Sequence, residues 1–202
     1  MDSDRELFSV LACVLASEIR KKKLQEYLLR LSYQDQLTGI RNNTSYIRML
    51  NQLLEHPVPV GVAFADLNGL KYLNDTYGHE YGDQALRHLA EVSMEYFAKD
   101  QLYRVSGDEF VIICPEVQEE VFIRQAQLLK ERLKQEEQGL AAFGYLWNDG
   151  TTAADRLLHG AERLMYQEKQ QHYRDSTRRV QECPGYAQAL YKRYRQREEK
   201  EE

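Results

Sequence analysis

The stretch Ser106-Gly107-Asp108-Glu109-Phe110 decides how this chain folds and where its chemistry lies. It separates two short apolar segments, residues 102–105 and 110–114. Two apolar segments joined by so tight a Gly-Asp turn predict a β-hairpin. The turn carries two adjacent carboxylates at its tip, beside a glycine that lets a ligand approach the backbone. We therefore expect a functional site at the tip of this hairpin.

A third carboxylate, Asp66, follows the apolar run of residues 60–65. Because this run is apolar on both of its faces, it predicts a strand in the centre of a sheet. A buried strand that ends in an aspartate, beside a hairpin tip that carries Asp108 and Glu109, would form a cage for a hard divalent cation with a nucleotide triphosphate bound to it.

The composition narrows the class of protein. A length of 202 residues with a 43% hydrophobic share favours one domain, or one domain with a helical extension. A net charge of -5 and a pI near 5.6 argue against nucleic-acid binding. The three cysteines are scattered and have no metal-ligand spacing, which suits a reducing compartment. With no secretory signal and no apolar stretch long enough to span a bilayer, we expect a cytoplasmic protein without direct membrane insertion.

Residues 5–32 lack glycine and proline and carry leucines at helical spacing, which predicts one long helix. The simpler interpretation is a helix that docks on its own domain. The alternative is a signalling helix that pairs with a second subunit and carries input from an upstream sensory domain. Fewer than four clean heptads leave both interpretations open.

The remaining pattern alternates helices and strands. Helices are expected at residues 42–54, 83–98, 117–138 and 152–172, a short helix or turn at 68–75, and strands at 58–65 and 140–147 in addition to the hairpin. This order, βααββαβ, predicts an α+β fold, similar to an α/β sandwich, with a mixed, largely antiparallel central sheet flanked by helices. The charged tail at 175–202 is expected to be partly helical or disordered.

Four motifs in order carry a resemblance to a known family. They are Asp35-Gln36-Leu37-Thr38-Gly39, the run Asp66 to Asp75, the run Tyr77 to Asp83, and Arg104-Val105-Ser106-Gly107-Asp108-Glu109-Phe110. Together they resemble the GGDEF domain of diguanylate cyclases, whereas any one alone is a weak signal. The resemblance divides the chain into a connector helix (1–32), a GGDEF domain with GGDEF/nucleotidyl-cyclase-like topology (33–174) and the tail (175–202).

The resemblance implies an activity and its partners. Two GTP molecules condense into cyclic-di-GMP with release of pyrophosphate, and each protomer of a homodimer holds one GTP. Asp66, Asp108 and the backbone carbonyl of Leu67 would hold Mg²⁺, or Mn²⁺ in its place. Glu109 would act in catalysis or organise the metal, and Gly107 would let phosphates approach the backbone. Without the motifs, Asp66 would be a strand-ending residue and Glu109 a residue that faces water.

Four further positions match substrate-binding residues of the family, and a fifth residue is an expected substitute. Asn74 and Asp83 would recognise guanine, because an amide and a carboxylate together pair with its edge and leave buried polar groups unpaired with adenine. Taken alone, Asn74 could be a turn residue and Asp83 a helix N-cap. Lys71 and Lys169 would contact phosphates. The family's next phosphate-binding arginine is replaced by Tyr173, so Arg174 is the expected substitute.

The sequence departs from the family pattern elsewhere. Ser106 stands where the signature has glycine, which would be costly if that backbone has a positive φ. The product-inhibition motif keeps Asp100 but has Phe97 in place of its arginine, so tight feedback binding is not expected. The Leu-Thr-Gly segment ends in Asn42-Asn43 where the family has Asn-Arg, so coupling to the linker is expected to differ. Two alternatives to an active cyclase remain: a catalytically weak GTP-binding regulatory module and a purely structural dimerisation module.

Overall fold

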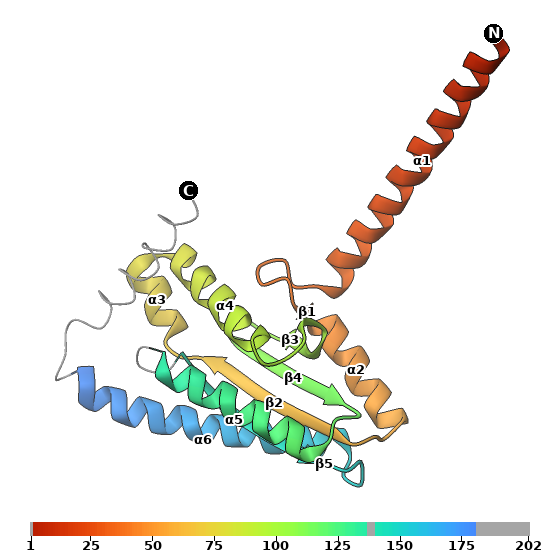
Figure 1. Cartoon of the computed structure of the whole chain (residues 1–202). Helices are drawn as coiled ribbons and strands as arrows, with labels where there is room; N and C mark the ends of the chain where they lie inside the picture. The colour runs from red at the N-terminus through yellow and green to blue at the C-terminus, as the bar shows by residue number, and fades with distance from the viewer. Residues whose placement is uncertain (1, 137–139, 181–202) are drawn as a thin grey trace.

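The computed structural model describes residues 2–136 and 140–180 (Figure 1). Its helices are α1 (Asp2–Tyr33), α2 (Asn43–Glu55), α3 (Leu70–Tyr77), α4 (His79–Met94), α5 (Glu119–Gln135) and α6 (Ala154–Val180), with a 3-10 turn η1 (Lys99–Gln101). Its strands are β1 (Arg41–Asn42), β2 (Val60–Leu67), β3 (Leu102–Arg104), β4 (Glu109–Pro115) and β5 (Ala141–Asn148). From β2 onward the order is βααββαβ, as the sequence predicted.

The five strands form one mixed sheet in the order β1-β3-β4-β2-β5. The pairs β3–β4, β4–β2 and β2–β5 are antiparallel, and only the two-residue strand β1 pairs in parallel, with β3. The expected α+β class, the central position of β2 and the β3–β4 hairpin are therefore confirmed. Strand β1 was not predicted, because two residues carry no periodicity.

Alternation along β2 sends its side chains to two separate cores. Val62 and Phe64 pack with α2 and α6 on one face of the sheet. Ala63 and Ala65 pack with α4 and α5 on the other face. Because successive side chains of a strand point to opposite faces, Asp66 continues the row of Val62 and Phe64. The aspartate at the end of β2 therefore lies on the α6 side of the sheet.

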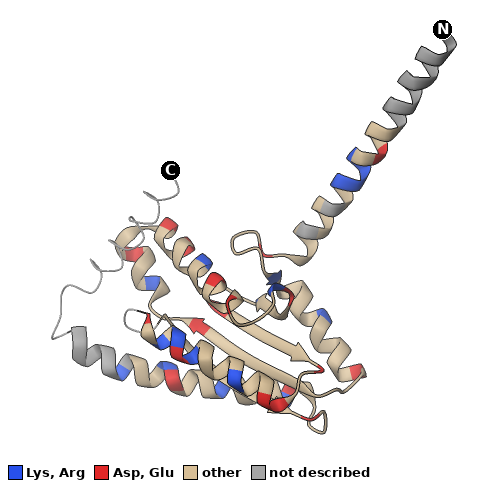
Figure 2. Ribbon diagram, in the orientation of Figure 1, with Lys and Arg blue, Asp and Glu red and all other residues tan. Residues whose placement is uncertain are grey.

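Helix α1 projects away from the domain (Figure 1), and its middle carries a basic patch (Figure 2). Leu15, Ile19, Leu24 and Leu28 on it are all more than half exposed. The interpretation that this helix docks along its own domain is therefore wrong. Within the described residues no helix is both long and apolar enough to cross a membrane.

Several element boundaries differ from those expected. Helix α4 begins at His79, four residues before the expected start, with Gly78 as its N-cap. Asp83 is therefore not a helix N-cap, and that alternative interpretation is wrong. Helix α6 continues to Val180, past the residue at which we expected the domain to end. The expected properties of residues 181–202 lie outside the described part of the chain.

Candidate active site

The register of the sheet brings two of the predicted acids together. Asp66 on β2 is the direct cross-strand partner of Glu109 on β4. Directly opposed residues of an antiparallel pair share a face, so both carboxylates lie on the α6 side. Asp108 precedes Glu109, and its backbone carbonyl accepts a hydrogen bond of 3.1 Å from the amide of Leu67. The end of β2 and the hairpin tip thus form one acidic edge.

Helix α6 brings a lysine onto this edge. Its backbone lies tight against β5 at Gly144, where a Cβ atom would stand only 2.2 Å from the amide nitrogen of Met165. Glycine is required there because any side chain would push the helix away. One turn after Met165, Lys169 donates through Nζ to Oδ1 of Asp66. Gly144 therefore lets α6 pack close enough to the sheet for Lys169 to reach Asp66.

The surroundings of Asp66 raise the pKa of its carboxyl group. Burial raises its pKa above the ordinary value, and the nearby charges of Asp108 and Glu109 raise it further. The hydrogen bond and positive charge of Lys169 act in the opposite direction but do not cancel the rise. The ionised form of Asp66 therefore lowers the stability of the fold. Such a perturbed pKa is typical of a functional residue.

Two side chains fix the hairpin tip. Arg104 donates to the carbonyl of Gly107 from Nε and Nη2, at 3.1 and 2.7 Å, and from Nη1 to Asp35 at 3.2 Å. Ser106 donates from Oγ to Oε2 of Glu109 at 2.6 Å. Sequence reasoning assigned no role to either side chain, although both lie inside the quoted motif. A charged residue four positions before Asp108, at the end of the first hairpin strand, was the available signal for Arg104.

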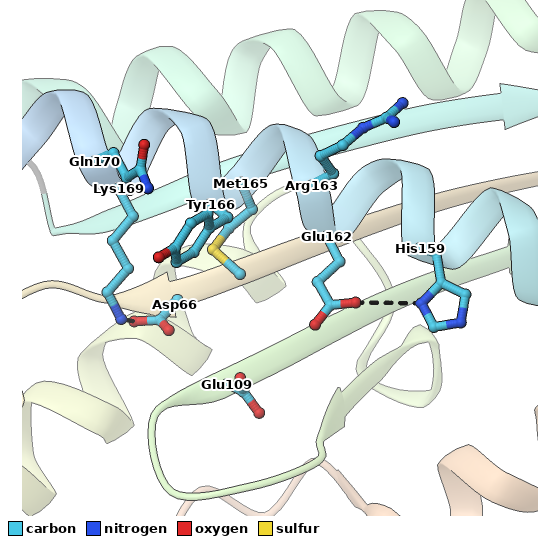
Figure 3. Close-up of a pocket in the computed structure, with 9 residues that line it drawn as sticks. All are labelled: Asp66, Glu109, His159, Glu162, Arg163, Met165, Tyr166, Lys169 and Gln170. Carbon is cyan, nitrogen blue, oxygen red and sulfur yellow. Dashed lines mark hydrogen bonds and ion pairs between the residues drawn. The ribbon is translucent and has the colours of Figure 1, made fainter.

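The acids border an open pocket of about 600 Å³ (Figure 3). Asp66 and Glu109 line it from the sheet, and α6 lines it with a polar face that includes His159, Glu162 and Lys169. Figure 3 shows Lys169 reaching down to Asp66 and Glu162 pointing toward the hairpin. The pocket is large enough for a nucleotide-sized ligand.

The expected cost of a serine in the signature does not arise. Among the described residues other than glycine, only Glu116 has a positive φ, so Ser106 has an ordinary backbone. A Cβ atom added at Gly107 would meet nothing within 4 Å. The fold itself therefore gives no packing reason for Gly107, and the open space beside the tip suits the approach of a ligand.

The predicted guanine-binding residues lie on the helices of the other layer. Asn74 belongs to α3, and Asp83 lies half-buried near the start of α4. A Cβ atom at Gly82 would stand 2.0 Å from Oδ1 of Asn74, so only glycine leaves room for this amide. Oδ1 of Asn74 is buried and has no hydrogen-bond partner among the described residues. Lys71 is exposed in the first turn of α3, three residues before Asn74.

The donor set suits a hard divalent cation. Carboxylate and carbonyl oxygens are the ligands that Mg²⁺ prefers. The ammonium group of Lys169 already places a positive charge against Asp66. Across the described residues, no three His, Cys, Asp or Glu side chains converge closely enough to hold a metal. The expected set of Asp66, Asp108 and the Leu67 carbonyl needs only two side chains, so it stays a prediction.

Comparison with known proteins identifies the family. The family model described as "Diguanylate cyclase, GGDEF domain" matches residues 32–175. The chain belongs to the GGDEF family. The match begins at the end of α1 and includes the sheet, the hairpin and α6 up to residue 175.

Relatives of this GGDEF chain carry several names. It is 30% identical over 127 residues to the cyclic di-GMP phosphodiesterase PdeR of Escherichia coli. This alignment covers 61% of this chain and 19% of PdeR. It is 29% identical over 191 residues to the diguanylate cyclase DgcP of the same organism, over 81% of this chain and 54% of DgcP. The chain thus spans about half or less of these curated relatives.

A solved structure supports the fold. The crystal structure of the coiled coil and GGDEF domain of DgcB from Caulobacter crescentus, in complex with c-di-GMP, matches with a TM-score of 0.65. It covers 81% of this chain and 94% of the DgcB chain at 22% identity. The likeness confirms a GGDEF fold preceded by a helix.

The remaining predicted residues lie away from the acidic edge or at its rim. Arg174 is exposed on the last part of α6, beyond Lys169. Asp100 lies exposed in η1 before the hairpin. Phe97, at the position of the family's inhibition-site arginine, is buried, and its ring centroid lies 6.0 Å from that of Phe122. Position 97 of this GGDEF domain is therefore part of the core.

Proposed function

We propose that this GGDEF chain is the catalytic module of a diguanylate cyclase. Two GTP molecules would condense into cyclic-di-GMP and two pyrophosphates. In each half-reaction, the 3′-hydroxyl of one nucleotide attacks the α-phosphorus of the other, a new P–O bond forms, and the bond to pyrophosphate breaks. The observation that carries this proposal is the meeting of Asp66, Glu109 and the Asp108 backbone at one end of the β2–β4 pair.

The residues of the chain have distinct parts in this scheme. Asp66 and Asp108 with the Leu67 carbonyl would hold Mg²⁺ or Mn²⁺, which when bound offsets the charge that develops on the phosphates. Glu109 lies on the same face as Asp66 and lines the pocket, where it would act on the attacking hydroxyl or order the site. Lys169 would exchange its partner Asp66 for phosphate oxygens once the nucleotide enters, and Lys71 and Arg174 would hold the outer phosphates.

The base would lie between α3 and α4. The unpaired Oδ1 of Asn74 and the half-buried Asp83 lie on this pair of helices. The N1–H and the amino group of guanine would donate to Oδ1 of Asn74 and to Asp83, whereas adenine would place its N1 acceptor against one of these oxygens.

The proposed reaction needs two copies of the chain, because each copy has one such acidic edge and the product contains two nucleotides. The exposed leucines of α1, among them Leu24 and Leu28, offer a surface for pairing with a second copy. Replacing both with aspartate should weaken association in analytical ultracentrifugation and lower turnover at low protein concentration. An upstream sensory domain is the proposed source of control over this pairing.

Incubation with GTP and Mg²⁺, followed by chromatographic detection of cyclic-di-GMP and pyrophosphate, tests the proposal. The matched control is Asp108→Asn, which keeps the size of the side chain and removes its charge. No product at high protein concentration, with Asp108→Asn indistinguishable from the native chain, would contradict the proposal.

A second candidate is a GTP-binding regulatory module with little turnover. Tyr173 at the place of the family's phosphate-binding arginine favours it, as does a relative of similar sequence that is named a phosphodiesterase. Thermal stabilisation by GTP without any product would support this candidate. The absence of both product and stabilisation would leave a purely structural role.

A further inference from the structure

Ser106 makes a contact that the family signature, with glycine at this position, has no side chain to make. Its Oγ lies 2.6 Å from Oε2 of Glu109, three residues further along the hairpin. This distance is typical of a hydroxyl that donates to an ionised carboxylate. Because an ionised carboxylate only accepts, the direction of the hydrogen bond is fixed: Ser106 donates and Glu109 accepts.

The backbone around this contact is held in place. The amide of Val105 donates to the carbonyl of Glu109 at 3.0 Å and closes the base of the tip. Arg104 holds the carbonyl of Gly107 with two nitrogens. Ser106 has no positive φ, so its side chain is presented without backbone strain. The hydroxyl therefore acts from a fixed position.

Glu109 would otherwise be free to sample several rotamers. Its side chain has three torsions, lines an open pocket and is only partly buried. Oε1 makes no hydrogen bond or ion pair with the part of the chain that is described. The contact with Ser106 thus engages one oxygen, restricts the side chain and leaves the second oxygen available to the pocket that also contains Asp66.

We propose that Ser106 is a positioning residue for Glu109. Its hydroxyl holds Oε2 and presents Oε1 to the pocket, so that the acid is ordered before a nucleotide arrives. The inference rests on the proposed cyclase function for its kinetic consequence, but the ordering of Glu109 is a property of the free protein. Ser106 in the signature would then order the Glu109 side chain and would not impair the site.

Three variants test this proposal. Ser106→Ala and Ser106→Gly remove the hydroxyl, and Ser106→Thr keeps it. The matched control is Thr151→Ala, which removes a similar exposed hydroxyl–carboxylate contact, Thr151 Oγ1 to Asp149 Oδ1 at 2.6 Å, in the turn after β5. The measurements are the kcat and KM for GTP, the Tm, and the χ1 and χ2 populations of Glu109 from NMR couplings in the free protein.

The expected result separates the variants. Alanine and glycine should lower kcat by roughly 3- to 10-fold with KM and Tm unchanged, which is the scale of one lost hydrogen bond to a charged group. Threonine should stay within about twofold of the native chain, because it keeps the donor. Glu109 should populate one rotamer with serine or threonine and several with alanine or glycine. The Thr151→Ala control should change none of these quantities.

Two outcomes would overturn the inference: native kcat and an unchanged Glu109 rotamer in Ser106→Ala, or a loss in Ser106→Thr as large as that in Ser106→Ala. If the native chain makes no cyclic-di-GMP, the proposed function fails, and the NMR populations alone decide the role of Ser106. Rotamer averaging in the alanine variant but not in the threonine variant would then still support it.

Discussion

The two sides of the site satisfy their polar groups in opposite ways. At the acidic edge of the sheet, Asp66 is paired with Lys169, Glu109 with Ser106, and the Gly107 carbonyl with Arg104. On the α3–α4 side, the buried Oδ1 of Asn74 has no partner among the described residues. An unpaired buried acceptor costs free energy, which a ligand that donates to it would return.

The two sides of the site would contribute differently to the proposed reaction. At the acidic edge, the register of the strands fixes the positions of the carboxylates. The ammonium group of Lys169 pairs with Asp66 there. On the helix pair, the buried Oδ1 of Asn74 has no partner among the described residues. Together with Asp83 it offers two acceptors, which the N1–H and the amino group of guanine would match. The first side would determine the rate of the reaction, and the second would determine which nucleotide reacts.

The largest expected effect comes from Asp66→Asn at the acidic edge. Turnover should fall by about 100- to 1,000-fold, the scale of removing one preorganised electrostatic group. The Tm should not fall, because burial raises the pKa of Asp66 and its ionised form is a cost to the fold. Product assays and differential scanning calorimetry check both parts. The exposed Asp155→Asn on α6 is the control, and a fall in Tm equal to that of a core mutation would contradict the account.

Gly82→Ala tests the helix side. Its new Cβ would displace the Asn74 amide, so the KM for GTP should rise roughly tenfold and discrimination against ATP should weaken. A double-mutant cycle gives a stricter test, because Asn74→Ala removes the nearest obstacle to the new Cβ and leaves the end of the flexible Leu70 side chain, at 2.8 Å, to move aside. In that background Gly82→Ala should have almost no further effect. Additive losses in the double variant would contradict the proposed contact.

The smallest effect is expected from Asp35→Asn, at the turn that Arg104 joins to the hairpin tip. Burial by itself raises the pKa of Asp35, but hydrogen bonds from Thr38 and the charge of Arg104 outweigh it, so the pKa is lowered overall. The native carboxylate should therefore stabilise the domain by about 1–2 kcal/mol at neutral pH.

The pH dependence of this stabilisation has a definite sign. A lowered pKa in the folded state means that the unfolded chain binds protons more tightly, so the contribution of Asp35 is complete above its unfolded value near 3.8 and is lost as pH falls through the folded pKa. Urea unfolding of both proteins between pH 7 and pH 3 measures it. A gap between them that widens on acidification would refute the assignment.

The sequence was most informative where hydrophobic periodicity and motifs coincide. The fully apolar run before Asp66 predicted a central strand, and the hairpin followed from its Gly-Asp turn. Element ends were less predictable, because α4 begins with His79-Glu80-Tyr81-Gly82, residues that carry no apolar stripe. The N-cap interpretation of Asp83 failed because it depended on where α4 begins.

The contacts of the site depended on tertiary structure. Lys169 was expected near phosphates, and its pairing with Asp66 follows from the tight packing of α6 on Gly144, which no local pattern shows. A cost at Ser106 was expected only if its φ were positive, and only the fold shows that it is not. Asn42 matches the family's Asn-Arg pair and was given no role of its own, yet its side chain caps α2 and donates to the carbonyl of Ser32 at the end of α1.

Phe97 makes the loss of a feedback arginine difficult to reverse. Its ring is buried against Phe122, so a return to arginine would place a guanidinium group among aromatic rings. Such a change would destabilise the domain before it could restore any affinity for product. An arginine at this position would therefore also require repacking around Phe122 of α5.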